Sequence, residues 1–489
     1  MSLANYIPTG DDYLRYLPEI ILCAAGTLIM FLEAVMGERR KPSLLWLTGA
    51  AMVAAIWGSA VAFTVGGTGF QNMVIVDGFT TFFRILVLAV GLLTVVSSVE
   101  YLDREKANAG EYYALLLFSI AGQSVMVSAN ELIMVFIGLE ISSIASYILA
   151  GYLRDDRRNN ESALKYFLLG SFATAFLLYG IAWVYGTTGT TNLAEVRRTL
   201  MTPEIAPSMA LIGTAAALMF VGFAFKVSAA PFQVWAPDVY QGAPAPVSAF
   251  LSTGPKAAAF AVFIRVFATA FGPIAGRWEP YVWGSAIATM VVGNFAALTQ
   301  TNIKRLLAYS SIAHAGYVLV AVTAHSDIGN AAAMFYLAAY ALMQIGAFAV
   351  VTYFARQGEK YVNVDDLAGL GVRQPMVAAM LTIFLLSLIG VPLTGGFFGK
   401  FYIFRAALDS NLVWLTIIGL LNSAVAAYYY LRIIVVMYMR EPGAASENVG
   451  PVGPGLRVAM IGSAIGTLVL GIFPGLVLDF AGRSAGLVK

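Results

Sequence analysis

The sequence predicts an all-α, polytopic integral membrane protein, and three observations support this class. Of the 489 residues, 59% are hydrophobic and only 11% are charged, whereas a soluble domain carries roughly 25% charged residues. Mean hydropathy is +0.78. Apolar stretches of about 20 residues, each long enough to cross a bilayer as a helix, recur from one end of the chain to the other.

Apolar windows of this length define about fourteen transmembrane helices. The fourth and fifth nearly touch and are divided at Ala129-Asn130, because a single helix over both would be too long. The longest loop, at about 188–208, is too short to fold as a soluble domain. The spans are expected at 16–36, 43–65, 78–100, 111–129, 130–153, 160–187, 209–241, 244–272, 279–300, 302–325, 327–355, 374–409, 411–438 and 456–480.

The charges of the loops predict the orientation of the helices. Lysines and arginines concentrate in the loops after odd-numbered spans, among them the loop Glu38-Arg39-Arg40-Lys41, and are fewer on the other side, which includes Lys489. The positive-inside rule places the richer side in the cytoplasm. Both termini are therefore expected in the periplasm, and the chain in the inner membrane of a bacterium.

Two spans contain helix-breaking residues. Pro231 and Pro237 interrupt the seventh span, and Pro392, Gly395 and Gly396 interrupt the twelfth. Proline removes a backbone donor and clashes with the preceding turn, and broken backbone at membrane depth is tolerated only where protein or a water-filled cavity satisfies it. A simple proline kink is the alternative for either span, but two breaks, each beside a lysine, favour functional ones.

The positions of the two breaks suggest an internal repeat. Grouping spans four to eight and nine to thirteen places the broken helix fourth in each five-helix block, and such blocks enter the membrane from opposite sides, as inverted repeats do. Residues 1–489 then form a single membrane domain. Its parts are the N-terminal helices 1–3 (1–110), the two repeats (111–272 and 279–438), and the last helix with its tail (456–489).

Cysteine and histidine usage limits the cofactors that the chain can hold. Cys23 is the only cysteine, so the sequence cannot build a disulfide, an iron–sulfur cluster or a cysteine-based zinc site. His314 and His325 lie about 16 Å apart on one predicted helix and cannot share a haem. No strand precedes a Gly-rich turn, which argues against a nucleotide-binding fold. The net charge of +2 without a basic patch gives no reason to expect a nucleic-acid partner.

Four ionisable residues lie near the middle of long apolar spans: Glu140, Lys226, Lys256 and His314. A charge at the centre of the bilayer costs about 2.5–3.5 kcal/mol on insertion scales. Four such groups at one depth therefore predict a row of proton-binding sites, for moving protons or cations across the membrane.

Each member of the row has a functional and a structural interpretation. Burial drives a lysine to lose its proton, and a nearby carboxylate opposes this loss. Glu140 and Lys226 could therefore act as a switch, or form a static ion pair that holds helices in register. Lys256 has no obvious partner. His314 titrates near neutrality and suits a relay, although a histidine hydrogen-bonded between helices would look the same.

Further charged residues lie nearer the span ends. Lys400 follows the break in the twelfth span on its outer side, where a proton could leave the row, whereas a structural lysine there would snorkel to the interface. Lys165 lies near the inner face and could feed Glu140, although a snorkelling lysine would explain it equally well. Asp238 is expected to cap a half-helix. Snorkelling is the default interpretation of four arginines: Arg84, Arg265, Arg405 and Arg432.

Three segments resemble the antiporter-like subunits of respiratory complex I, and the similarity covers about residues 75–440. They are Gly138-Leu-Glu140-Ile-Ser-Ser, the long run from Lys226 to Lys256, and Lys304-Arg-Leu-Leu-Ala-Tyr-Ser-Ser-Ile-Ala-His314. Asp238-Val-Tyr-Gln-Gly-Ala-Pro and Ser252-Thr-Gly-Pro-Lys256 are similar to the N-type pattern of that family rather than to its L and M sisters. Ala245 lies between Pro244 and Pro246, where members of that family often have threonine.

The resemblance implies a proton-translocating subunit that works while a separate redox arm reduces quinone with NADH. Glu140 and Lys226 would be the coupled pair, Lys256 and His314 the relay, and Lys400 the outlet. NADH, flavin (FMN), iron–sulfur clusters and quinone would belong to other subunits. The implied partners are K-like and M-like neighbours, the lateral helix of L, and the lipid bilayer. A subunit of a multi-subunit cation/proton antiporter and a non-pumping scaffold are the alternatives.

Overall fold

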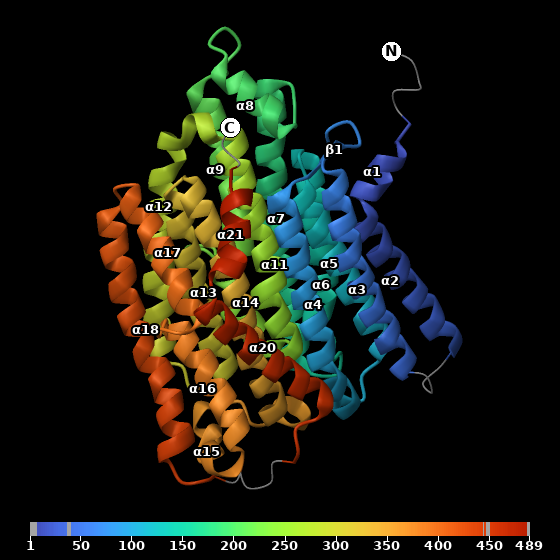
Figure 1. The fold of residues 1–489 in the computed structure, drawn as a ribbon, viewed down its shortest axis with the longest axis vertical. Coiled ribbons are helices and arrows are strands. Elements are labelled where there is room, and N and C mark those ends of the chain that lie inside the picture. The colour runs from blue at the N-terminus through green and yellow to red at the C-terminus, as the bar shows by residue number, and fades with distance from the viewer. Residues whose placement is uncertain (1–6, 37–40, 444, 446–449, 487–489) are drawn as a thin grey trace.

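The computed structural model describes residues 7–36, 41–443, 445 and 450–486. Long helices run roughly along one axis in this part of the chain (Figure 1). Twelve of its helices are long and apolar enough to cross a membrane. These twelve, together with α5 and the broken pair α16–α17, coincide with the fourteen predicted spans. The predicted all-α membrane fold is confirmed.

The N-terminal helices flank one side of the bundle (Figure 1). Between α3 and α4 lies a short antiparallel ribbon, in which Gly67 pairs with Val76. This ribbon was not predicted from the sequence. Glu38, Arg39 and Arg40 of the predicted cytoplasmic loop lie outside the described residues, as does Lys489. The elements are α1 (Gly10–Arg15), α2 (Leu17–Met36), α3 (Lys41–Val65), β1 (Gly67–Gly69), β2 (Val74–Val76) and α4 (Gly78–Glu105).

The first predicted repeat contains a broken seventh span. α9 ends at Val227 and α10 begins only at Trp235, so the predicted break is confirmed at Pro231, whereas Pro237 lies inside α10. The loop expected at 188–208 contains a short amphipathic helix, whose amides at Ala194 and Glu195 are capped by Asn192. The elements are α5 (Ala109–Ser128), α6 (Leu132–Ala150), α7 (Arg157–Thr188), α8 (Leu193–Met201), α9 (Met209–Val227), α10 (Trp235–Gly242), α11 (Ala245–Arg265), η3 (Val266–Ala270) and η4 (Gly272–Ile274).

The second predicted repeat is broken in its twelfth span, as expected. α16 ends at Ile389, Gly390 takes a left-handed conformation (φ 94°), and α17 begins at Gly395. After this repeat, α20 packs obliquely across α14 (Figure 1). The elements are α12 (Ala275–Leu298), α13 (Ile303–Thr323), α14 (Asp327–Ala355), η5 (Gln357–Glu359), η6 (Val364–Leu367), α15 (Leu370–Arg373), α16 (Pro375–Ile389), α17 (Gly395–Asp409), α18 (Val413–Met439), α20 (Pro454–Ile472) and α21 (Gly475–Ser484).

Backbone contacts recur at one fixed interval along the two predicted repeats. Glu131 forms an isolated antiparallel bridge with Asn192, and Asn302 forms one with Asn363. Both members of the second bridge lie 171 residues after their counterparts (302 minus 131, and 363 minus 192). This register supports the proposed division into two repeats and aligns α6 with α13.

The same register extends to helix packing. A side chain on Gly122 would come within 2.5 Å of the backbone nitrogen of Ser142, and one on Gly293 within 2.5 Å of that of Ala313. Both members of the second contact again follow the first by 171 residues. Glycine is therefore required in each repeat where α5 approaches α6 and where α12 approaches α13.

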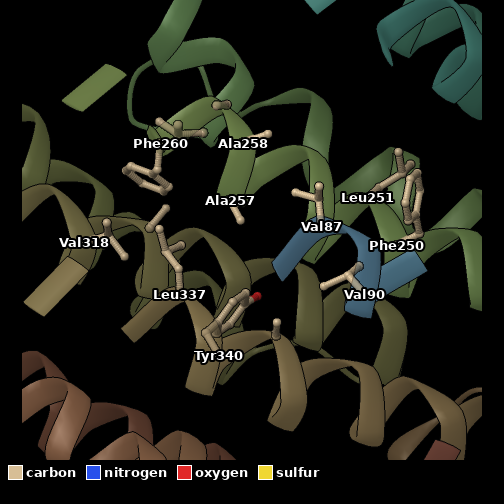
Figure 2. Close-up of a cluster of buried hydrophobic side chains, with 14 of the residues drawn as sticks. Val87, Val90, Phe250, Leu251, Ala257, Ala258, Phe260, Val318, Leu337 and Tyr340 are labelled. Atoms are coloured by element: carbon tan, nitrogen blue, oxygen red, sulfur yellow. The ribbon is translucent and has the colours of Figure 1, made fainter. Parts of the chain in front are cut away.

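α11 lies at the centre of the bundle. Its membrane window is 94% buried, as is that of α13. Phe250, Ala257 and Phe260 of α11 lie in one apolar cluster with Val90 of α4 and Leu337 of α14 (Figure 2). The burial of an almost continuous apolar helix fixes the place of its one central charge, Lys256.

Candidate functional site

The break between α9 and α10 is satisfied by α12. The Ser285 hydroxyl donates to the Ala230 carbonyl at 2.7 Å, and the Ala230 amide donates to Thr289 Oγ1 at 2.8 Å. The Trp235 indole, on the other side of the break, donates to the Phe225 carbonyl at 2.9 Å. Protein groups thus supply the hydrogen bonds that broken backbone at membrane depth requires.

Lys226 lies at the end of α9, directly before this break. Its ammonium donates to Ser143 Oγ at 2.6 Å and lies 5.2 Å from the centre of the Tyr147 ring. Glu140 lies one turn before Ser143 on α6, close enough for an electrostatic interaction with Lys226. However, Glu140 Oε1 is buried without a hydrogen-bond partner. The structure therefore places Glu140 and Lys226 near each other without an ion pair between them. Ser143 is the hydrogen-bond partner of Lys226 instead.

A small cavity connects this lysine with α11. It has a volume of about 10 Å³, near the lower limit for one water molecule. It extends from Lys226 to Pro255, the residue before Lys256, and three serines of α6 line it: Ser142, Ser143 and Ser146. The three serines place hydroxyl groups beside Lys226, and the α11 side of the cavity is lined by Leu251, Pro255 and Ala259.

Lys256 and His314 are both 2% exposed. His314 belongs to α13, and Lys256 contacts α13 one helical turn before it. The Lys256 ammonium donates to Ser311 Oγ at 2.6 Å, three residues before His314. His314 Nδ1 lies 2.5 Å from the Tyr336 hydroxyl, and Nε2 lies 3.1 Å from the Tyr430 hydroxyl. His314 therefore lies between hydroxyl groups on both ring nitrogens, next to the lysine that the sequence left without a partner.

Lys400 lies beyond the second break, and its side chain is turned inward. Its ammonium donates to Ser423 Oγ at 2.7 Å and to the Ile389 carbonyl at 2.9 Å, at the end of α16. It also lies 4.8 Å from the centre of the Tyr317 ring, which belongs to the same helix as His314. Lys400 is only 6% exposed, so the snorkelling alternative does not describe it.

Lys165 occupies a different kind of environment. Its ammonium forms ion pairs with Asp238 at 2.7 Å and with Glu161 at 2.6 Å, and 41% of its side chain is exposed. Asp238 also binds Arg305 at 2.6 Å. The prediction that Asp238 caps a half-helix is wrong, because α10 has no side-chain cap. Instead, the two carboxylate oxygens of Asp238 bind Lys165 and Arg305. Lys165 is thus held to α10, and its role in feeding Glu140 stays a prediction.

A buried lysine at the start of α13 forms an ion pair that was not predicted from the sequence. The Lys304 ammonium binds Glu359 Oε2 at 2.6 Å and the Ala243 carbonyl at 2.5 Å. The other oxygen of Glu359 accepts the Ala245 amide at 2.7 Å. This ion pair therefore holds both sides of the turn between α10 and α11. Lys304 was visible in the sequence motif, but its partner lies 55 residues away in η5.

Two arginines expected to snorkel are instead buried ion-pair partners. Arg84 binds Glu19 of α2 at 2.7 Å, with side-chain exposures of 0% and 1%. Arg265, at the end of α11, binds Asp77 with two contacts of 2.9 Å. Burial raises the pKa of Asp77, but the Arg265 guanidinium and the hydrogen bonds from Thr80 lower it by more than burial raises it. The pKa of Asp77 therefore lies below its ordinary value.

Comparison with known proteins identifies the family. Residues 129–426 match the family model described as NADH:quinone oxidoreductase/Mrp antiporter, TM. NADH-quinone oxidoreductase subunit N 1 of Solibacter usitatus is 64% identical over 98% of each chain. Subunit N of Trichlorobacter lovleyi is 43% identical over 96% of each chain. The chain belongs to the N-subunit branch of the NADH:quinone oxidoreductase/Mrp antiporter family.

Solved structures of family members share this fold. A chain of respiratory complex I from Thermus thermophilus is 33% identical, with a TM-score of 0.80 over 95% of this chain and 99% of that one. A chain of the Mrp complex from Dietzia has a TM-score of 0.86 over 98% of both chains, but only 21% identity. The likeness to the Mrp chain therefore concerns the fold alone. Membership of the N-subunit branch is decided by the full-length relatives.

Proposed function

We propose that this N-type subunit moves protons through a buried row from Glu140 to Lys400, while other subunits of an NADH:quinone oxidoreductase reduce quinone with NADH. As a member of this branch, the chain is a proton-translocating membrane subunit. The proposed order is Glu140 and Lys226, then Lys256 and His314, then Lys400.

One observation supports this assignment more than any other. Lys226, Lys256 and Lys400 each donate to a serine hydroxyl, at 2.6, 2.6 and 2.7 Å. Among the described residues, no carboxylate lies within 4.0 Å of their ammonium groups. A hydroxyl accepts a hydrogen bond from an ammonium and donates one to a neutral amine. Each lysine can therefore release and regain its proton without losing its partner.

The other paired cations described above differ in this respect. Lys165, Lys304, Arg84, Arg265 and Arg305 all bind carboxylates. An ion pair favours the charged form of a lysine and opposes release of its proton. The cations thus fall into two groups by hydrogen-bond partner. Those bonded to serine would carry protons, and those bonded to carboxylates would hold the structure together.

The experiment is proton pumping by assembled enzyme in membrane vesicles. We expect Lys226→Met, Lys256→Met and Lys400→Met each to lower pumping and NADH:quinone activity together. Lys360→Met, at an exposed position, is the matched control and should have no effect. Normal pumping in an assembled Lys256→Met enzyme would remove the row from the mechanism.

The finer arrangement is also part of the proposal. Both termini would lie in the periplasm, and the loops after odd-numbered spans in the cytoplasm. K-like and M-like subunits and the lateral helix of L would be neighbours in the membrane. FMN and the iron–sulfur clusters would lie in other subunits, because Cys23 is the only cysteine of the chain and an iron–sulfur cluster is held by several cysteine thiolates.

A further inference from the structure

A large apolar groove opens between α9 and α12, outside the proposed proton row. Its volume is about 1020 Å³. Phe220, Phe232 and Phe267 contribute aromatic surface to its lining. Both helices that flank the groove are long and apolar enough to cross a membrane. A groove between two such helices faces either lipid or another membrane protein.

Two glycines widen this groove. Gly213 on α9 and Gly284 on α12 both line it, and a Cβ atom built on either one meets no atom within 4 Å. Glycine inside a helix weakens the helix relative to alanine. Neither glycine is required by a close contact within the chain, so the space they leave is available to a ligand.

One end of the groove has the character of a membrane interface. Arg277 is exposed and Tyr281 is 75% exposed, whereas Trp278 between them is buried and donates to the Phe271 carbonyl at 2.9 Å. Tyrosine concentrates where the headgroups of a bilayer begin, and arginine binds phosphate groups. The nearby carboxylate of Glu279 faces His325 at 3.5 Å, which leaves the Arg277 guanidinium available to an anion.

The other end of the groove offers no free hydrogen-bond donor from Ser285. It reaches Pro231 and Ser285 at the break between α9 and α10. The Ser285 hydroxyl already donates to the Ala230 carbonyl at 2.7 Å, so it offers no free donor to a polar ligand. From Arg277 to Ala288 the groove follows α12 for about 16 Å at 1.5 Å per residue, which is about half of a 30 Å hydrocarbon core.

We propose that the groove binds one acyl chain of a membrane phospholipid, whose phosphate pairs with Arg277. A cationic, aromatic rim followed by about 16 Å of apolar wall matches a headgroup and the chain below it. The end of the acyl chain would lie against Pro231, in the segment that joins the helix of Lys226 to α10. The bound lipid would thus support the broken helix from outside.

The test uses assembled enzyme in phosphatidylcholine vesicles that contain phosphatidylglycerol with a diazirine at the end of one acyl chain. After irradiation, we expect the probe to label the peptide that contains Pro231 and Phe232. The double variant Gly213→Phe/Gly284→Phe fills the groove with two aromatic rings and should lower this labelling by about tenfold. The acyl chain then buries fewer methylene groups in the groove and binds more weakly. Arg277→Gln should lower it less.

The matched control is Gly186→Phe/Gly462→Phe. These two glycines also have no atom within 4 Å of a built Cβ, but they do not line the groove, so labelling should stay unchanged. Equal labelling in the groove-filled and control variants would overturn the proposal. A photoactivatable amino acid at Tyr281 that cross-links to a neighbouring polypeptide rather than to lipid would overturn it as well.

Discussion

The ammonium of Lys256 donates to the hydroxyl of Ser311 at 2.6 Å, in the most deeply buried part of the bundle. His314 follows Ser311 by one helical turn and lies between two tyrosine hydroxyls. This relationship joins α11 to α13, and therefore the first predicted repeat to the second.

The Ser311 hydroxyl should be needed for transport. Ser311→Ala leaves a buried ammonium without its side-chain partner, at a cost of about 1–3 kcal/mol, and we expect pumping to fall by about tenfold. Ser311→Thr keeps a hydroxyl and should retain more activity. Ser252→Ala is the control, because Ser252 donates only to its own helix, at the Ala249 carbonyl. Pumping rates in vesicles with equal amounts of assembled enzyme decide the matter.

Glu140 and Lys226 should behave as one unit. Glu140→Gln and Lys226→Ala should each lower pumping together with NADH:quinone activity, and the double variant should lose less than the sum of the two. The reason is that each group matters chiefly through the charge of the other. Strictly additive losses in free energy of activation would show that the two residues act independently.

The Lys304–Glu359 pair should be structural. Glu359→Gln leaves Lys304 buried and unpaired, which costs roughly 3–5 kcal/mol, so we expect less assembled enzyme and a lower melting temperature. Lys304→Met/Glu359→Gln removes both charges and should restore assembly and near-normal pumping. If this double variant assembles but does not pump, the division of cations by partner is wrong.

The partners of the buried charges could be predicted only in part from the sequence. Lys256, His314 and the two helix breaks were predictable because charge and free backbone are costly in lipid. The serine partners were not, because Ser143 lies 83 residues from Lys226 and Ser311 lies 55 residues from Lys256. Arg84 was misinterpreted for the same reason, since its partner Glu19 lies 65 residues away.

Short-range features were also beyond prediction. The ribbon of β1 and β2 has only three residues in each strand, too few for a visible alternation of apolar and polar residues. The regular register of the repeats became apparent from backbone bridges at Glu131 and Asn302, because these bridges depend on chain path rather than on side-chain identity.

The orientation can be tested by labelling. In a Cys23→Ser background, which removes the only native cysteine, a cysteine at position 40 should resist a membrane-impermeant thiol reagent in intact cells. It should react after the cells are opened. Ready labelling of intact cells would reverse the proposed orientation and place Lys400 on the inner side of the row.

The central claim is that the serine-bonded lysines release their protons, and Lys400 offers the most direct test. It lines a cavity of about 470 Å³, so an arginine has space there without repacking of the core. Arginine keeps a charge that it cannot release. Proton pumping should therefore be measured in assembled Lys400→Arg and Lys400→Ala enzymes. We predict that Lys400→Arg impairs pumping at least as much as Lys400→Ala, whereas full activity with arginine would contradict the account.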